Sequence, residues 1–143
     1  RYVEKQFQFG TTYDYIVRAL SLPRVGAPPS EVIESNESLP LTVTPKDTFP
    51  PTAPTSISIA SRGGIISLFW PPNAEPDVVG YNVYRSEDEQ SWTKITARPI
   101  TTITFGDRLV QIGKRYFYQI AAVDNAGNES PRSETKSEIA ESN

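Results

Sequence analysis

Residues 112–123 read Ile-Gly-Lys-Arg-Tyr-Phe-Tyr-Gln-Ile-Ala-Ala-Val, and Tyr116–Val123 is the longest stretch of strand-forming residues in the chain. Aromatic and β-branched residues of this kind favour a strand, and the length of the run predicts a central one. The next residues, Asp124–Asn128, are rich in types that tolerate a left-handed backbone. That composition predicts a hairpin turn with a bulge after the strand.

Shorter stretches of alternating apolar residues occur on both sides of this strand. Three prolines in Pro71–Asp77 interrupt them and predict a loop, because proline cannot donate to a strand ladder. No apolar period of 3.6 persists long enough for a helix. About seven short strands predict an all-β, two-sheet sandwich with Trp70, Tyr81, Tyr116 and Tyr118 in its core. The other expected strands are Ile57–Ile59, Ile65–Trp70, Gly80–Tyr84, Trp92–Ile95, Ile103–Phe105 and a weak one near Thr135–Ala140.

The composition excludes most catalytic and nucleic-acid-binding classes. The 143 residues include no Cys, His or Met, so a disulfide framework, a thiolate nucleophile and the commonest metal ligand and general base are missing. The net charge is -3, which opposes binding to DNA or RNA. No stretch has the roughly 20 apolar residues needed to span a bilayer. We therefore expect no enzyme activity, no cofactor, no metal, no nucleic acid partner and no membrane insertion by this segment.

An internal repeat explains the length of the chain. The segment Phe9–Leu20 aligns with Ile112–Val123, so that Tyr13 corresponds to Tyr116 at an offset of 103 residues, about one sandwich domain. Four prolines lie in Pro45–Pro54 and predict a semi-rigid linker. The expected organisation is the C-terminal strands of a preceding domain in residues 1–46, with Leu41–Thr44 as its last strand, a linker in 47–54 and a full domain in 55–143.

Several motifs together resemble the fibronectin type III family in its bacterial extracellular form: Pro50–Pro54 at a domain start, Leu68–Trp70, Gly80–Arg85 and Gly113–Tyr118. The resemblance implies an immunoglobulin-like β-sandwich of fibronectin type III topology. It also implies that Trp70 is the core tryptophan of the second strand and that Tyr116, like Tyr13 in the partial copy, is the tyrosine-corner residue. By the same resemblance the chain is a non-catalytic spacer or interaction module of a larger bacterial surface, periplasmic or secreted protein.

The partial copy lacks the strands that would cover it. Three strands cannot bury one another's apolar face, so we expect exposed apolar side chains in this region. Three explanations remain open: an excised piece of a longer protein, a missing half supplied by another chain, or a homodimer of two half-domains. The expected partners are thus neighbouring domains of the same polypeptide or a second copy. The side chains expected to be exposed are Phe7, Phe9, Tyr13, Tyr15, Val17 and Val43.

Two loops are the candidate ligand site. In a sandwich of this topology, residues 71–79 and 124–130 belong at the same pole, where recognition loops lie in related architectures. The alternative function is therefore a glycan- or protein-binding module that acts through these loops. A third possibility, implied by the family resemblance, is an accessory role beside a carbohydrate-active enzyme. The candidate ligand residues are Asn73, Glu75, Asp77, Asn125 and Asn128.

Other candidate sites have a plainer structural explanation, which we favour. Trp92 is either a sugar-stacking residue or packs over a sheet edge. The oxygen donors of Asp124, Asn125, Asn128 and Glu129 either bind calcium or close an Asx turn, and the turn is favoured. Asn36-Glu37-Ser38 and Asn128-Glu129-Ser130 fit the glycosylation sequon but are interpreted as ordinary polar loops.

Overall fold

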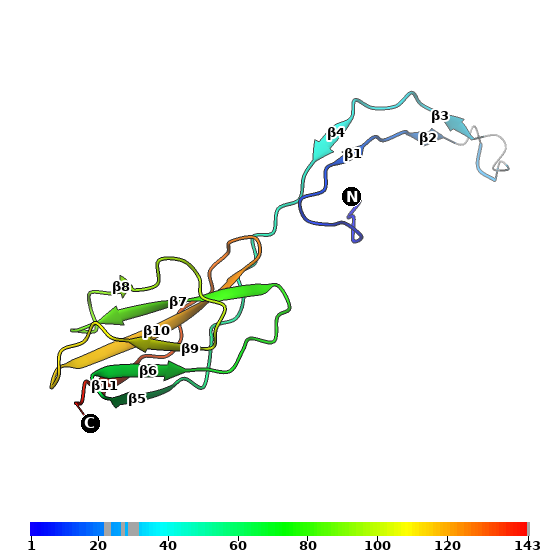
Figure 1. Cartoon of the computed structure of the whole chain (residues 1–143). Coiled ribbons are helices and arrows are strands. Elements are labelled where there is room, and N and C mark those ends of the chain that lie inside the picture. Colours follow the sequence, from blue (N-terminus) through cyan, green and yellow to red (C-terminus); the bar gives the residue numbers. More distant parts are fainter. Residues whose placement is uncertain (22–23, 27, 29–31, 143) are drawn as a thin grey trace. The chain divides into compact units, whose positions relative to one another are not determined.

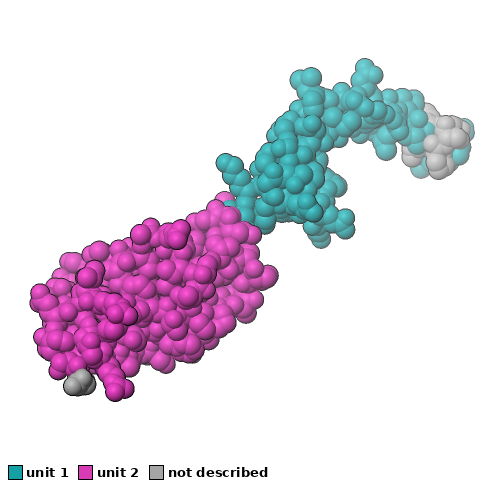
Figure 2. Space-filling model, viewed as in Figure 1, with its two compact units in different colours: residues 1–47 teal, residues 48–143 magenta. Residues whose placement is uncertain are grey.

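The computed structural model describes residues 1–21, 24–26, 28 and 32–142 and divides the chain into two compact units, residues 1–47 and residues 48–143 (Figure 2). Every regular element in the described residues is a strand, which confirms the all-β prediction (Figure 1). Unit 1 contains β1 (Tyr13–Tyr15), β2 (Leu20–Ser21), β3 (Ile33–Glu34) and β4 (Leu41–Val43). Unit 2 contains β5 (Ser58–Arg62), β6 (Ile65–Phe69), β7 (Val78–Ser86), β8 (Thr93–Lys94), β9 (Thr104–Asp107), β10 (Arg115–Asp124) and β11 (Lys136–Ile139).

Unit 2 is a sandwich of two antiparallel sheets. One sheet has the strand order β11-β10-β7-β8, and the other has the order β5-β6-β9. The expected central strand is β10, which pairs with β7 along eight positions and with β11 along four. The register of the pairing between β10 and β7 shifts between Val123 and Asp124, at the end of β10. The fold is therefore the immunoglobulin-like sandwich that the sequence predicts.

Every second side chain along the strands points inward, and these side chains fill the space between the two sheets. Trp70 is fully buried and lies edge-on to Tyr81, with ring centroids 5.4 Å apart. Tyr116 and Tyr118 from β10 are 2% and 1% exposed. Such aromatic pairs add packing energy to the area that they bury. The remaining buried members of the cluster are Ile57, Ile66, Leu68, Val83, Ile120, Ala122 and Ala140.

The packed unit begins before the end of the expected linker 47–54. Pro51 and Pro54 are buried in unit 2. The Thr52 N–H donates to a Glu75 carboxylate oxygen at 2.7 Å. Proline is tolerated here because these residues run along the sandwich outside any ladder. Residues 51–54 are thus part of the folded unit rather than a spacer.

Unit 1 is a long antiparallel hairpin. β1 pairs with β4, with Tyr13 opposite Val43, and β2 pairs with β3, with Leu20 opposite Glu34. Tyr13 and Tyr15 were expected to be exposed but are half-buried, because each ring shields the other at a centroid distance of 6.4 Å and the Tyr13 hydroxyl accepts a backbone N–H. The other four apolar side chains are exposed as expected: Phe7, Phe9, Val17 and Val43.

Candidate functional site

The structure brings the two candidate loops of unit 2 together. The Asn125 N–H donates to the backbone carbonyl of Asp77 at 2.9 Å, and Val78 pairs with Asp124 where β7 begins and β10 ends. The loops thus share one pole of the sandwich. Neither residues 71–79 nor residues 124–130 contain an aromatic side chain. A sugar ring would find no stacking surface within the loops themselves.

Two polar residues of the first loop, Asn73 and Glu75, hold the loop in place. The Asn73 amide donates to the Thr52 carbonyl at 2.9 Å, and the Asn73 N–H donates to the Tyr81 hydroxyl at 2.9 Å. Hydrogen bonds from Thr52, side chain first, lower the pKa of the Glu75 carboxyl to about 2. Asn73 and Glu75 therefore join the loop to Thr52, and these hydrogen bonds leave fewer of their donor and acceptor atoms for a ligand.

The second loop closes on Asp124, which is 2% exposed. One carboxylate oxygen accepts the Ala126 and Asn128 N–H groups at 2.9 and 2.7 Å, and the other accepts the Asn128 side-chain amide at 2.8 Å. Desolvation by burial raises the pKa of Asp124, but these hydrogen bonds outweigh it, so the net pKa is lowered. Gly127 supplies the positive φ of 88° that the turn needs. The Asx-turn interpretation accounts for the contacts of Asp124 and Asn128.

Trp92 belongs to a stacked cluster on the outer face of the four-stranded sheet. The Arg132 guanidinium carbon lies 4.0 Å from the centroid of the Tyr84 ring and 6.0 Å from that of Trp92. The Tyr84 hydroxyl and the Asn82 amide both donate to the Glu129 carboxylate. The half-buried Trp92 donates through its ring N–H to the Glu89 carbonyl at 3.1 Å. This surface is therefore occupied by cation–π and hydrogen-bond contacts within the chain.

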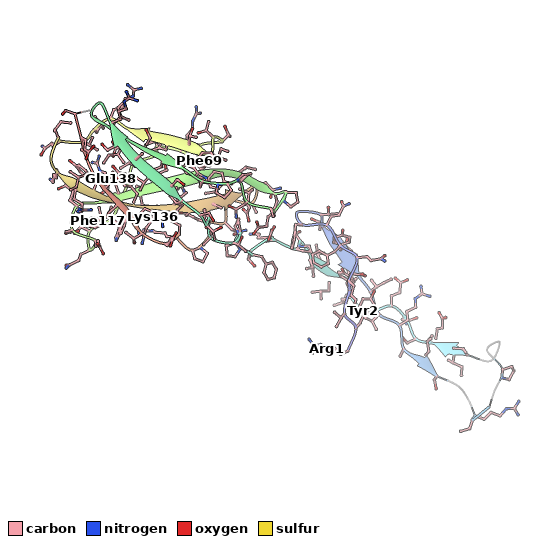
Figure 3. The ribbon with its side chains drawn as sticks, turned by 90° about the horizontal axis from the view of Figure 1, so that it is seen from below. Arg1, Tyr2, Phe69, Phe117, Lys136 and Glu138 are labelled. Atoms are coloured by element: carbon pink, nitrogen blue, oxygen red, sulfur yellow. The ribbon has the colours of Figure 1, made fainter. Side chains whose placement is uncertain are left out.

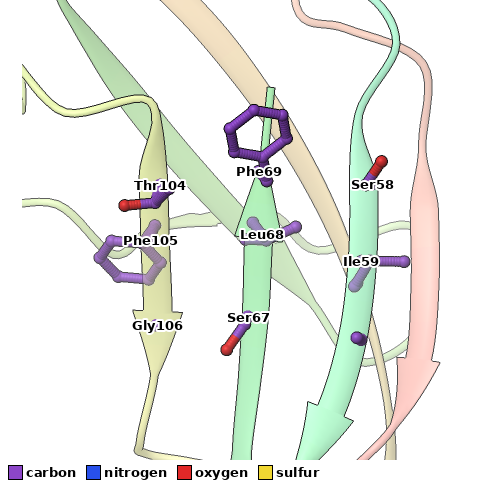
Figure 4. A pocket seen from close by; sticks show the side chains of 9 residues that line it. Ser58, Ile59, Ser67, Leu68, Phe69, Thr104, Phe105 and Gly106 are labelled. Atoms are coloured by element: carbon purple, nitrogen blue, oxygen red, sulfur yellow. The ribbon is translucent and has the colours of Figure 1, made fainter. Parts of the chain in front are cut away.

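The three-stranded sheet carries an open hollow of about 470 Å³ on its outer face. Phe69, 48% exposed, stands above it between Ser58 of β5 and Thr104 of β9 (Figures 3 and 4). Small residues form part of its floor, because Ala60, Ser67 and Gly106 pair across the same three strands. Sequence reasoning missed this surface, although the inward set Ile66, Leu68 and Trp70 implied that Phe69 points outward.

A buried ionic network joins the two sheets of the sandwich. Asp107, 4% exposed, accepts hydrogen bonds from Arg85 at 2.8 Å and from the Tyr118 hydroxyl and the Leu109 N–H, both at 2.9 Å. Burial, and then the neighbouring Asp107 charge, raises the pKa of Tyr118. The network contains one carboxylate, so it provides no pair of acids for general acid–base work.

Comparison with solved structures identifies the architecture. A fibronectin type III-like (Fn3-like) protein from Clostridium thermocellum is 32% identical, with a TM-score of 0.55, over 62% of this chain and 92% of that one. The chain belongs to the fibronectin type III family. No protein-family model matches it. The assignment rests on unit 2, whose sheets, core tryptophan and tyrosine corner have the expected order.

The curated relatives of this fibronectin type III chain are much longer proteins. An amylopullulanase from Thermoanaerobacterium thermosulfurigenes is 36% identical over 85 residues, which are 59% of this chain and 4% of the enzyme. An exo β-1,2-glucooligosaccharide sophorohydrolase from Parabacteroides distasonis is 35% identical over 72 residues, 50% of this chain and 10% of the enzyme. The chain thus spans a tenth or less of these relatives, and the matched region is a module within each.

Proposed function

We propose that this chain is a non-catalytic accessory module of a bacterial carbohydrate-active enzyme, in which the unit 2 sandwich spaces or presents neighbouring domains. The match to an amylopullulanase carries the proposal. The matched region has 85 residues, the length of one domain, and is only 4% of the enzyme. The catalytic residues of the parent enzyme would then lie outside this chain.

The chemistry of unit 2 supports a spacing role. Glu75, Asp124 and Glu129, carboxylates in or beside the candidate loops, accept hydrogen bonds from the chain itself. The buried Asp107 is likewise committed, to Arg85 and Tyr118. Carboxylates held in this way rigidify a scaffold, and rigidity is what a spacer contributes.

The proposed location is extracellular or in the cell envelope. The amylopullulanase and the sophorohydrolase act, by their names, on polysaccharides or oligosaccharides and come from bacteria. Polysaccharides are too large to enter a cell intact, so their hydrolases work outside it. Among the described residues, no helix is long and apolar enough to cross a membrane.

Affinity electrophoresis of the full chain in gels containing pullulan, amylopectin or β-1,2-glucan tests the proposal. We expect unretarded migration in all three gels and no release of reducing sugar from the dissolved glucans. Release of reducing sugar that persists through repeated purification would refute the non-catalytic assignment. Retardation by one glucan would instead favour the alternative function of glycan binding.

Two sets of variants locate the surface if retardation occurs. The first replaces Asn125 and Asn128 in the second loop by Ala, and the second is Phe69→Ala on the outer sheet face. Loss of retardation in the loop variants alone would support binding at the loop pole. Loss in Phe69→Ala alone would assign the glycan to the hollow of the three-stranded sheet, where a ring can stack.

A further inference from the structure

The hydrogen bond of the tyrosine corner in unit 2 has an equivalent in unit 1. The Gln111 N–H donates to the Tyr116 hydroxyl at 3.0 Å, and the Gln8 N–H donates to the Tyr13 hydroxyl at 2.8 Å. Both pairs are five residues apart, and both members shift by 103 residues. The glycine between them has a positive φ in each unit, 83° at Gly113 and 77° at Gly10. The two segments are therefore similar in structure as well as in sequence.

A serine pair anchors the returning strand in the same way in both units. In each case the serine N–H donates to a carbonyl of the first strand, and its hydroxyl accepts the N–H of that same residue. The first strands correspond at an offset of 103 and the serines at an offset of 95, so the connection in unit 1 is eight residues longer. The equivalent pairs are Ser35 with Ala19 and Ser130 with Ala122, then Ser38 with Val17 and Ser133 with Ile120.

The correspondence extends to the first residues of the chain. Asp107 accepts the Leu109 N–H at 2.9 Å, and Glu4 accepts the Gln6 N–H at 2.8 Å. The offset is again 103, so residues 1–4 correspond to β9. In unit 2, β9 is a strand because it pairs with β6. Residues 1–4 form no strand, since the described residues of unit 1 include no equivalent ladder partner for them.

The face that is buried in unit 2 is open in unit 1. Tyr118 and Ile120 are at most 1% exposed, whereas their equivalent positions line a hollow of about 780 Å³ at Tyr15 and Val17. Val17 is 70% exposed. On the returning strand, unit 2 has Lys136 and Glu138 where unit 1 has the apolar Leu41 and Val43, 64% and 38% exposed. Unit 1 thus presents a more apolar inner face with less covering it.

We propose that residues 1–47 are the last three strands of a second sandwich and that their occupant is a segment equivalent to residues 48–103, joined to Arg1. In unit 2, this segment supplies β6 to pair with β9 and β7 to pair with β10. A second copy of this chain is a poorer occupant. Its own β6 and β7 are already paired within its unit 2, so it would have to unfold to donate them.

The repeat fixes the design of the test. In unit 2, residue 103 is followed by Thr104, whose equivalent is Arg1. A fusion that places an additional copy of residues 48–103 directly before Arg1 therefore keeps the natural register. Hydrogen exchange of the backbone amides of residues 13–19 is the measurement, with residues 116–122 of the same molecule as the internal standard. The matched control carries Val83→Asp in the added copy alone.

In the original chain we expect residues 13–19 to exchange at least about 100-fold faster than residues 116–122, because open strands lack protection. The fusion slows them by at least about tenfold, and the Val83→Asp control does not. A second fusion with Leu41→Lys and Val43→Glu matches the inner face to that of unit 2 and removes any side-chain mismatch. Protection in either fusion supports the proposal.

Three results overturn it: strong protection in the original chain as a monomer, the same protection in a dimer of the original chain, or fast exchange in both fusions while residues 116–122 stay protected. The dimer result would assign the face to a second copy. The glucan experiments concern the surfaces of unit 2, so failure of either proposal leaves the other standing.

Discussion

Replacing Asp107 by Asn tests whether the buried ionic network stabilises the unit 2 sandwich. The substitution keeps the shape of the side chain but removes its charge, which leaves the Arg85 guanidinium, 21% exposed in its side chain, without its carboxylate. Removing one partner of a fully buried pair costs about 3–5 kcal/mol. Arg85 keeps its bond to the Leu109 carbonyl at 2.8 Å and some water, so we expect about 2–3 kcal/mol.

Thermal unfolding followed by circular dichroism measures this loss. For a domain of about 100 residues, 1 kcal/mol lowers the midpoint by about 4–8 °C, so Asp107→Asn lowers it by about 10–20 °C. The matched control is Glu134→Gln, which breaks the exposed Glu134–Lys136 pair at 2.9 Å and leaves the midpoint nearly unchanged.

A double-mutant cycle with Arg85→Met separates the pair from the rest of the network. The double mutant should lose at least about 1 kcal/mol less stability than the sum of the two single-mutant losses, because the two side chains are in contact. A midpoint within about 3 °C of the parent for Asp107→Asn, or strict additivity in the cycle, would refute the reasoning.

Three further predictions concern the same sandwich. Tyr116→Phe removes the hydroxyl that accepts a backbone N–H at 3.0 Å and should cost about 1 kcal/mol in urea unfolding; an unchanged midpoint would contradict it. Gly80→Ala would put a Cβ 2.9 Å from a proline carbon and lower the melting midpoint, whereas the matched Gly106→Ala, at 3.4 Å, changes it little; equal effects would argue against the close contact. Burial, and then the Glu129 hydrogen bond, raises the pKa of Tyr84 from 10.0 to about 12. Because the folded pKa is raised, this contribution to stability is present below pH 10 and is lost between pH 10 and 12. Tyrosinate absorbance in a pH titration should therefore include a tyrosine that ionises near pH 12, and Tyr84→Phe should remove that contribution.

The sandwich was predictable because its signals are local. Alternation placed Trp70 and Tyr116 inside, and three prolines marked the loop before β7. The ends of strands were less predictable, since pairing with a neighbour decides them. β7 continues to Ser86 because β10 offers a partner that far, and the alternating pattern alone ended at Tyr84.

The surfaces were harder to predict because distant segments build them. Arg132, Tyr84 and Trp92 come from a loop, a strand and the end of a hairpin, and no spacing in the sequence brings them together. The full extent of the repeat was hidden for a related reason. Glu4 and Asp107 are different residue types, although each accepts the equivalent backbone N–H in its own unit. In addition, the connection before the serine pairs differs in length by eight residues, so the serines do not align at the 103-residue offset.

The two units differ in how completely they use their hydrogen-bonding edges. The four-stranded sheet of unit 2 ends in β8 and β11, which carry Lys94 and Lys136, and charged edge strands discourage pairing with other chains. In unit 1, β4 reads Leu41-Thr42-Val43, with no charge at all. A sandwich with charged edges and self-paired loops suits a spacer. A hairpin whose last strand is uncharged and whose inner face is apolar suits the completion of a second domain, so one repeated sequence pattern accounts for both proposals.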